Sequence, residues 1–189
     1  MRIIDPMARH KEFSEAAALD AAMRCFWAGG YEGTSTAALM SAMKIGKRSM
    51  YDTYGDKRSL YLRSLQLYIE LAEERTRAEI DDETPPAEAI RAIMIATPAD
   101  AVVPKGCFAT LAATESLDDT EVSRLFDGFM QRTRARLEVQ LLRAGVTPSR
   151  VPTLSRLLED AALGVRVRAR AGLVQQDEID EIISFACDL

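Results

Sequence analysis

The sequence predicts an all-α protein in which a three-helix domain is joined to a six-helix domain. Two observations lead to this prediction. Nearly every segment of the 189 residues repeats its apolar side chains with the period of a helix. Within residues 36–54, a short helix, a three-residue break and a second short helix follow one another, which is the helix-turn-helix pattern. We place the domain boundary after residue 57, so that the domains cover residues 1–57 and 58–189.

The first domain contains three expected helices. In the first, within residues 13–30, apolar side chains recur at intervals of three and four residues. Paired glycines end this helix, because glycine tolerates a left-handed turn. Hydroxyl side chains suited to an N-cap precede the second helix, over residues 36–43. The third helix begins near Lys47, after the turn of residues 44–46.

Six further helices follow in the second domain, where breaks rich in proline, glycine or acidic residues separate them. We expect them over residues 55–80, 86–95, 107–116, 120–145, 153–172 and 177–189. The stretch VRVRARA, residues 165–171, alternates apolar and basic side chains as a strand would. No other segment offers a strand to pair with it, so we predict a helix with Arg166 and Arg170 on one face.

Composition excludes several classes of protein. No apolar run approaches the roughly 18 residues of a membrane span, and the N-terminus lacks the apolar core of a signal peptide. We therefore expect a cytoplasmic protein with no membrane partner. Three widely spaced cysteines and one histidine favour neither a disulfide framework nor a metal site. The sequence contains no nucleophile–base constellation, so we expect no enzyme activity and no cofactor.

Charge is distributed unevenly along the chain. The net charge is −5, yet residues 1–57 carry eight basic and seven acidic side chains. Residues 44–57 alone gather four basic side chains and two tyrosines. An acidic C-terminal part is unsuited to a polyanion, so contact with nucleic acid would use a small N-terminal surface.

Residues at the start of the third helix have the chemistry of DNA recognition. A recognition helix places its N-terminal side chains against base edges. Lysine and arginine can donate to guanine, and serine can contact several bases, which fits Lys47, Arg48 and Ser49. Lys57 stands at the start of the following helix, where its charge and the free backbone N–H groups could hold one phosphate.

The stretch of residues 18–65 resembles the DNA-binding domain of the tetracycline-repressor (TetR) family of transcriptional regulators. The spacing SxYxxYxxK, from Ser49 to Lys57, is its most specific feature. The other matching residues are Phe26, Gly30, Tyr31, Thr34, Ser35, Thr36, Ile45, Tyr51 and Tyr54. Family members commonly have glycine at position 44, a small polar residue at position 46, and glycine or proline at position 48. Lys44, Gly46 and Arg48 depart from this pattern, so base specificity is not carried over.

The resemblance implies a ligand-responsive transcriptional regulator, usually a repressor, that binds a palindromic operator in double-stranded DNA and is released by a small molecule. It implies a DNA-binding surface made of Thr34, Ser35, Thr36, Lys44, Lys47, Arg48, Ser49, Tyr51, Tyr54 and Lys57. Packing of Tyr54 in the domain core is the alternative for that residue. The alternative function is a helical dimer that acts in protein interaction without binding DNA.

The resemblance also implies a homodimer and a pocket for a small-molecule effector in the second domain. The last two helices would form a four-helix bundle with their partner through Leu154, Leu157, Leu158, Ala161, Ile179, Ile182 and Ile183. The candidate pocket residues are Tyr68, Met94, Cys107, Phe108, Leu111, Phe126, Phe129 and Met130. Each of these side chains could instead be plain core. Arg166 or Arg170, if turned inward, would favour an anionic effector, and Cys107 opens a helix whose dipole could activate a sensing thiol.

Overall fold

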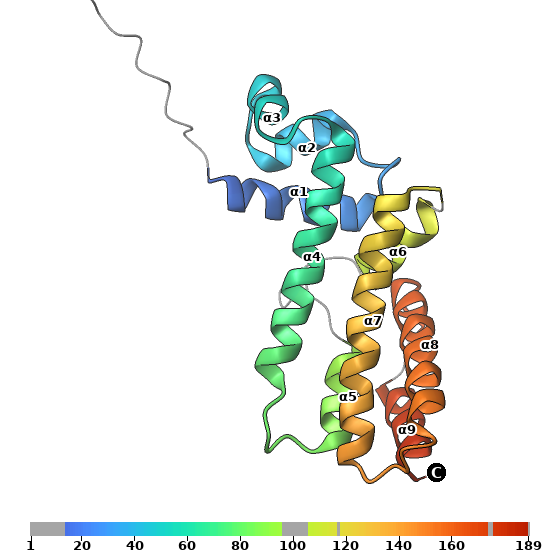
Figure 1. Ribbon diagram of the computed structural model, residues 1–189. Coiled ribbons are helices and arrows are strands. Elements are labelled where there is room, and N and C mark those ends of the chain that lie inside the picture. The colour runs from blue at the N-terminus through green and yellow to red at the C-terminus, as the bar shows by residue number, and fades with distance from the viewer. Residues whose placement is uncertain (1–13, 96–105, 117, 174–175, 189) are drawn as a thin grey trace, which may run out of the picture.

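The computed structural model describes residues 14–95, 106–116, 118–173 and 176–188. These residues form nine helices and no strand, so the expected all-α fold is confirmed (Figure 1). The helices are α1 (Glu15–Gly29), α2 (Thr36–Met43), α3 (Lys47–Tyr54), α4 (Lys57–Glu79), α5 (Pro86–Ile95), α6 (Phe108–Glu115), α7 (Thr120–Arg143), α8 (Val151–Arg170) and α9 (Gln176–Asp188).

Helices α2 and α3 form one end of the molecule, and α4 runs from them toward the opposite end (Figure 1). Helix α4 begins where the Asp56 side chain accepts a hydrogen bond from the Ser59 N–H at 2.6 Å, a standard N-cap. Its 23 residues pack against α1, α6 and α7. One rigid helix therefore connects the helix-turn-helix with the rest of the chain.

Aromatic side chains hold α1, α4 and α6 together. Tyr61 of α4 meets the edge of Phe26 of α1 at 5.0 Å between ring centroids, and it meets Phe108 of α6 at 5.6 Å. About two turns further along α4, Tyr68 contacts Trp27 at 5.0 Å and Phe108 at 5.7 Å between ring centroids. All five rings are buried, and edge-to-face pairs add to the free energy gained from burial.

A second core lies among α5, α7, α8 and α9. It contains apolar side chains from all four helices, among them Ile90, Leu137, Leu158 and Ile183. The VRVRARA stretch lies within or just after α8, which confirms the helical prediction for it. Val165 and Arg166 are buried while Val167 and Arg168 are exposed, a pairing that a helix produces and an alternating strand does not.

The predicted domain boundary coincides with the first residue of α4, Lys57. The first core nevertheless continues across it, because residues of α1, α2 and α3 pack in one cluster with residues of α4, α6 and α7. The division into two domains stays a prediction. Most of the loop expected between residues 97 and 106 lies outside the described residues. Among the described helices, none is long and apolar enough to cross a bilayer.

Replacing Phe108 by alanine should destabilise the protein by about 3–5 kcal/mol, because the ring is fully buried between two tyrosines of α4. The measurement is chemical denaturation at fixed protein concentration. The control is Leu142→Ala at a half-exposed position of α7, which should change stability by no more than about 0.5 kcal/mol. Equal losses in the two variants would contradict this account of the core.

Candidate DNA-binding surface

The turn between α2 and α3 is a tight C-terminal cap. The N–H of Lys44 donates to the Ser41 carbonyl at 3.3 Å, and the N–H of Ile45 donates to the Met40 carbonyl at 3.2 Å. This pair of bonds is the Schellman motif. Lys44 has a φ of +54°, in the left-handed region that favours glycine. The local geometry thus explains why glycine suits this position, and Ile45 anchors the turn by its burial.

Helix α3 has an inward and an outward face. Met50 and Tyr54 are one turn apart and both are buried in the first core. Lys47, Arg48 and Tyr51 lie on the outer side, and the Tyr51 side chain is 40% exposed. A helix that is short, anchored on one side and basic on the other can enter a groove without rearrangement.

The basic side chains of the outer face have few partners within the chain. Arg48 lies 3.5 Å from Asp52, measured from Nε to Oδ2, and its side chain is 95% exposed. An exposed pair of this kind contributes little to stability. Arg48 can therefore exchange Asp52 for a base or a phosphate. Lys57 lies at the N-terminus of α4, with its Nζ 4.2 Å above the centre of the Tyr31 ring. This cation–π contact holds the ammonium at the helix end.

Three residues of the predicted surface have their side chains engaged within the chain. The Thr34 hydroxyl is buried and donates to the Gly30 carbonyl at 2.7 Å. The buried Tyr54 hydroxyl donates to the Glu15 carbonyl at 3.1 Å, and Arg63 covers its ring. Ser35 caps α2 by accepting from the Ala38 N–H at 3.1 Å. The structure shows the core alternative for Tyr54, and neither Tyr54 nor Thr34 offers its side chain to the outer surface.

Polar contacts join the start of α4 to the start of α7, and the connection between α1 and α2 to α6. Arg58 forms a two-pronged ion pair with Asp119 at the start of α7, at 2.8 and 2.9 Å. Arg58 donates both bonds, which lowers the pKa of the Asp119 carboxyl below its ordinary value. The stabilisation from this pair is therefore present above the ordinary carboxyl pKa and is lost as the pH falls through the lowered one. Close by, Glu115 accepts from the Tyr31 N–H at 3.0 Å.

A second set of contacts caps the C-terminal end of α1. Arg170, from the end of α8, donates to the carbonyls of Trp27 and Ala28 at 3.1 and 3.2 Å. The indole N–H of Trp27 donates to the Gly106 carbonyl at 3.2 Å. Helix α1 has no basic residue in its own last turn, so a distant arginine supplies the positive charge that its carbonyls favour. Sequence reasoning missed this role of Arg170, because 142 residues separate the arginine from the carbonyl of Ala28.

The eight candidate pocket residues pack in or against the two cores. Six of them are buried, and Leu111 and Phe126 are half-buried. The pocket predicted there stays a prediction. Arg166 does point inward: it is buried, and it donates to the carbonyls of Met94 and Ile93 at 3.2 and 3.1 Å. The Tyr68 hydroxyl is fully buried, and burial raises its pKa well above the ordinary value.

The predicted dimer residues divide between the inside of the chain and its surface. Leu154, Leu158, Ile179 and Ile183 are buried in the chain's own second core. Leu157 is 54% exposed, and Ala161 and Ile182 are partly buried.

Two further apolar side chains of the same helices are exposed, Val167 of α8 at 55% and Phe185 of α9 at 65%. Their spacing from Leu157 and Ile182, at multiples of three to four residues, is the signal that would have found them.

Comparison with known proteins agrees with this geometry. Residues 18–63 match the family model of bacterial regulatory proteins, tetR family. The chain is 34% identical over 142 residues to YezE, an uncharacterized HTH-type transcriptional regulator of Bacillus subtilis (strain 168), a match that covers 73% of each protein. It is 29% identical over 174 residues to the HTH-type transcriptional repressor ComR of Escherichia coli (strain K12), which covers 87% of this chain and 83% of ComR.

Solved structures share the fold. A cysteine-substituted variant of the TetR family transcriptional regulator CifR, complexed with 26-bp double-strand operator DNA, superimposes with a TM-score of 0.74 at 24% identity. The match covers 95% of this chain and 98% of CifR. A TetR transcriptional regulator from Chloroflexus aurantiacus J-10-FL gives a TM-score of 0.71 at 20% identity, covering 90% of each chain.

The left-handed turn at Lys44 generates a prediction about stability. Lys44→Gly and Lys44→Ala remove the same charge, but only glycine adopts a positive φ without strain. Lys44→Gly should therefore be more stable than Lys44→Ala by about 1 kcal/mol in thermal or chemical denaturation. If the alanine variant were as stable as the glycine variant, the turn would not be strained as described.

Proposed function

Because the chain belongs to the tetR family of bacterial regulatory proteins, we propose that it is a repressor that binds a palindromic DNA operator as a homodimer and leaves it when a small molecule binds. That it is a transcriptional regulator with a DNA-binding helix-turn-helix follows from the family. The observation that carries the proposal is the outer face of α3, where Lys47, Arg48 and Tyr51 project from a helix whose other face is anchored in the core.

Contacts to DNA divide by position. Lys47 and Arg48 lie in the first turn of α3, where side chains of a recognition helix reach base edges. Lys44 on the turn and Lys57 at the start of α4 flank this position, so we assign them to the phosphate backbone. Ser49 and Thr36 are partly exposed and complete the proposed surface. This exposed basic face speaks against the alternative of a protein-interaction dimer without DNA binding.

The proposed dimer uses the exposed apolar face of α8 and α9. Leu157, Val167 and Phe185 lie on the outside of these two helices, which pack against each other. Gly164 lies on the same side of α8, and a Cβ built there meets open space. This face is apolar, and the glycine leaves room for another helix to pack closely against it. It therefore suits the same two helices of a second subunit. Two-fold symmetry would then present two α3 helices to half-sites about 34–36 Å apart.

Release by a small molecule would act through α4. This helix begins beside α3 and ends among α5 and α7, so a ligand that shifts its far end also moves the recognition helix. The spacing of half-sites is set by DNA, so a small tilt misaligns both subunits together. The repressor assignment is supported by the name of ComR, which is a transcriptional repressor.

Operator affinity should fall steeply with salt. If two basic side chains per subunit neutralise phosphates, a plot of log affinity against log salt should have a slope of about −3 to −4. Lys57→Ala removes two of these contacts from a dimer, so the slope should become shallower by about 1.8, at 0.9 per phosphate. The measurement is a mobility-shift titration with the DNA upstream of the protein's own gene at several salt concentrations.

The matched control for this titration is Arg124→Ala, which removes an exposed charge from α7 that pairs with Glu121 of the same helix. It should leave the slope unchanged. A wild-type slope near zero would refute the DNA-binding surface, and equal effects of the two variants would refute the role of Lys57.

The dimer prediction is tested separately. Phe185→Glu should convert the protein to a monomer and abolish high-affinity operator binding, because an unpaired carboxylate would be buried in an apolar interface. Leu142→Glu places the same charge on an exposed apolar position of α7 and should leave the dimer intact. Light scattering coupled to size-exclusion chromatography reports the mass. A Phe185→Glu protein that stays dimeric would exclude this face as the interface.

A further inference from the structure

We propose that a cavity between α4, α5 and α7 binds a small amphiphilic carboxylate, with an apolar chain in the cavity and its carboxylate against Arg77 and Arg136. The cavity has a volume of about 370 Å³, within the range of roughly 300–1,000 Å³ typical of small-molecule sites. It is separate from the eight aromatic and apolar residues that the sequence suggested as a pocket, none of which lines it.

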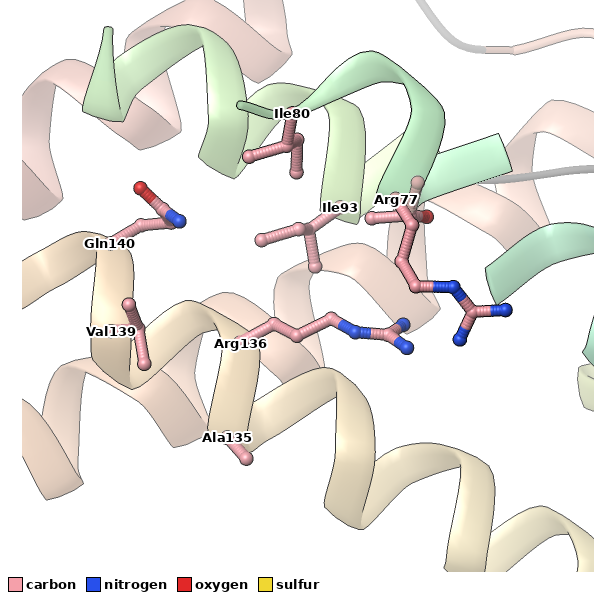
Figure 2. A pocket seen from close by; sticks show the side chains of 8 residues that line it. Arg77, Ile80, Ile93, Ala135, Arg136, Val139 and Gln140 are labelled. Carbon is pink, nitrogen blue, oxygen red and sulfur yellow. The ribbon is translucent and has the colours of Figure 1, made fainter. Parts of the chain in front are cut away.

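The walls of the cavity come from three helices that are far apart in sequence. Thr76, Arg77 and Ile80 line it at the end of α4, Ile93 lines it from α5, and Ala135, Arg136, Val139 and Gln140 line it from α7. Figure 2 shows the aliphatic side chains of Ile80, Ile93 and Val139 around the cavity and the guanidinium groups of Arg77 and Arg136 together at one end. The arrangement therefore has an apolar part and a cationic end.

The cationic end carries a surplus of positive charge. Glu73 is the acidic neighbour of both arginines, and it is nearly buried. Its carboxylate is already held by a third arginine, Arg132, whose Nε donates to Oε1 at 2.5 Å. Three guanidinium groups thus share one carboxylate. The residues that line the cavity include two of these arginines and no acidic side chain.

Arg77 and Arg136 are poorly satisfied by Glu73. The shortest distances to Oε2 are 3.9 Å from Nη1 of Arg77 and 3.5 Å from Nη2 of Arg136, at or beyond the limit of a hydrogen bond. A carboxylate ligand has two oxygens and can accept a hydrogen bond from each guanidinium group, so its charge and geometry fit this pair. The uncharged polar groups beside them are engaged, because Thr76 donates to Ala72 and Gln140 accepts from Arg143.

The apolar part of the cavity explains why the ligand needs a chain. Val139 is 54% exposed although it lines the cavity, and Ile80 is only half-buried. Covering such side chains with a hydrocarbon chain contributes about 25 cal/mol for each Å² removed from water. A neighbouring groove of about 620 Å³ also lies between α4 and α7, but Glu70 and Glu73 there balance Arg124 and Arg132. The net charge thus distinguishes the proposed site from this groove.

The binding test uses isothermal titration of the full chain with sodium octanoate below its micelle concentration. Octanoate should bind saturably, one molecule per chain, and at least about tenfold more tightly than acetate, which lacks the chain, or octan-1-ol, which lacks the charge. Arg77→Gln and Arg136→Gln should each weaken octanoate binding about tenfold or more. The control Arg124→Gln, an arginine of the same helix as Arg136, should stay within about twofold, because Arg124 does not line this cavity.

Val139→Trp is a second variant that does not touch the ion-pair cluster. The position is exposed, so the indole should fill the cavity without disturbing the core, and octanoate binding should be lost. Circular dichroism melts show whether each variant is folded. If an arginine variant does not fold, the Val139→Trp variant alone tests whether octanoate binds in this cavity. The proposal is overturned if octanol binds as tightly as octanoate, if wild-type protein binds no octanoate, or if Val139→Trp binds it unchanged.

An effect of this ligand on DNA rests on the proposed function and is measured in a separate arm. Arg77 and Ile80 lie at the end of α4 remote from α3, so octanoate should weaken operator binding in the mobility-shift assay. The operator should then weaken octanoate binding by the same factor, because coupling is reciprocal. Octanoate binding without any operator binding would refute the proposed function and keep the site. Operator binding without octanoate binding would refute the site alone.

Discussion

The packing of aromatic rings along α4 is the constraint on which the rest of the structure depends. Tyr61 and Tyr68 each contact a ring of α1 and the ring of Phe108 in α6, so one helix fixes both neighbours at once. Because α1 supports α2 and α3, the direction of the recognition helix follows from these contacts. The ion pair of Arg58 with Asp119, and the hydrogen bonds from Arg170 to the end of α1, add to an arrangement of helices that the buried rings already determine.

The polar side chains in and just before the helix-turn-helix divide between those that bond within the chain and those that are exposed. Thr34, Ser35 and Tyr54 make hydrogen bonds within the chain, and this leaves Lys47, Arg48 and Tyr51 to face outward. The left-handed Lys44 sets the angle between the two helices at some cost in backbone energy. The outward side chains of α3 project from a helix whose opposite face, with Met50 and Tyr54, is buried in the first core.

The same helix α4 connects the two ends at which binding is proposed. Its first residue, Lys57, lies beside the recognition helix, while Arg77 lies in its last turn beside the cluster around Glu73. At the α3 end, basic side chains are exposed where the binding of DNA is proposed. At the other end, a surplus of guanidinium groups adjoins an apolar cavity. Both ends carry incompletely neutralised positive charge in a chain whose net charge is −5, and this local charge favours the binding of an anion at each.

Helical period and the basic helix-turn-helix segment could be recognised from the sequence alone, because these signals are local and lie within one or two turns of a helix. The assignment of VRVRARA to a helix likewise needed only the absence of a pairing strand. Tertiary structure decided which side of each helix is covered. Leu158 is buried while Leu157 is exposed, and Thr34 is buried as well. The helical period identifies a stripe of apolar side chains, but only the position of the neighbouring helices determines which of them are covered. Arg77 and Arg136 meet at one cavity although they lie 59 positions apart in the sequence, and no pattern in the sequence relates residues that only the fold brings together.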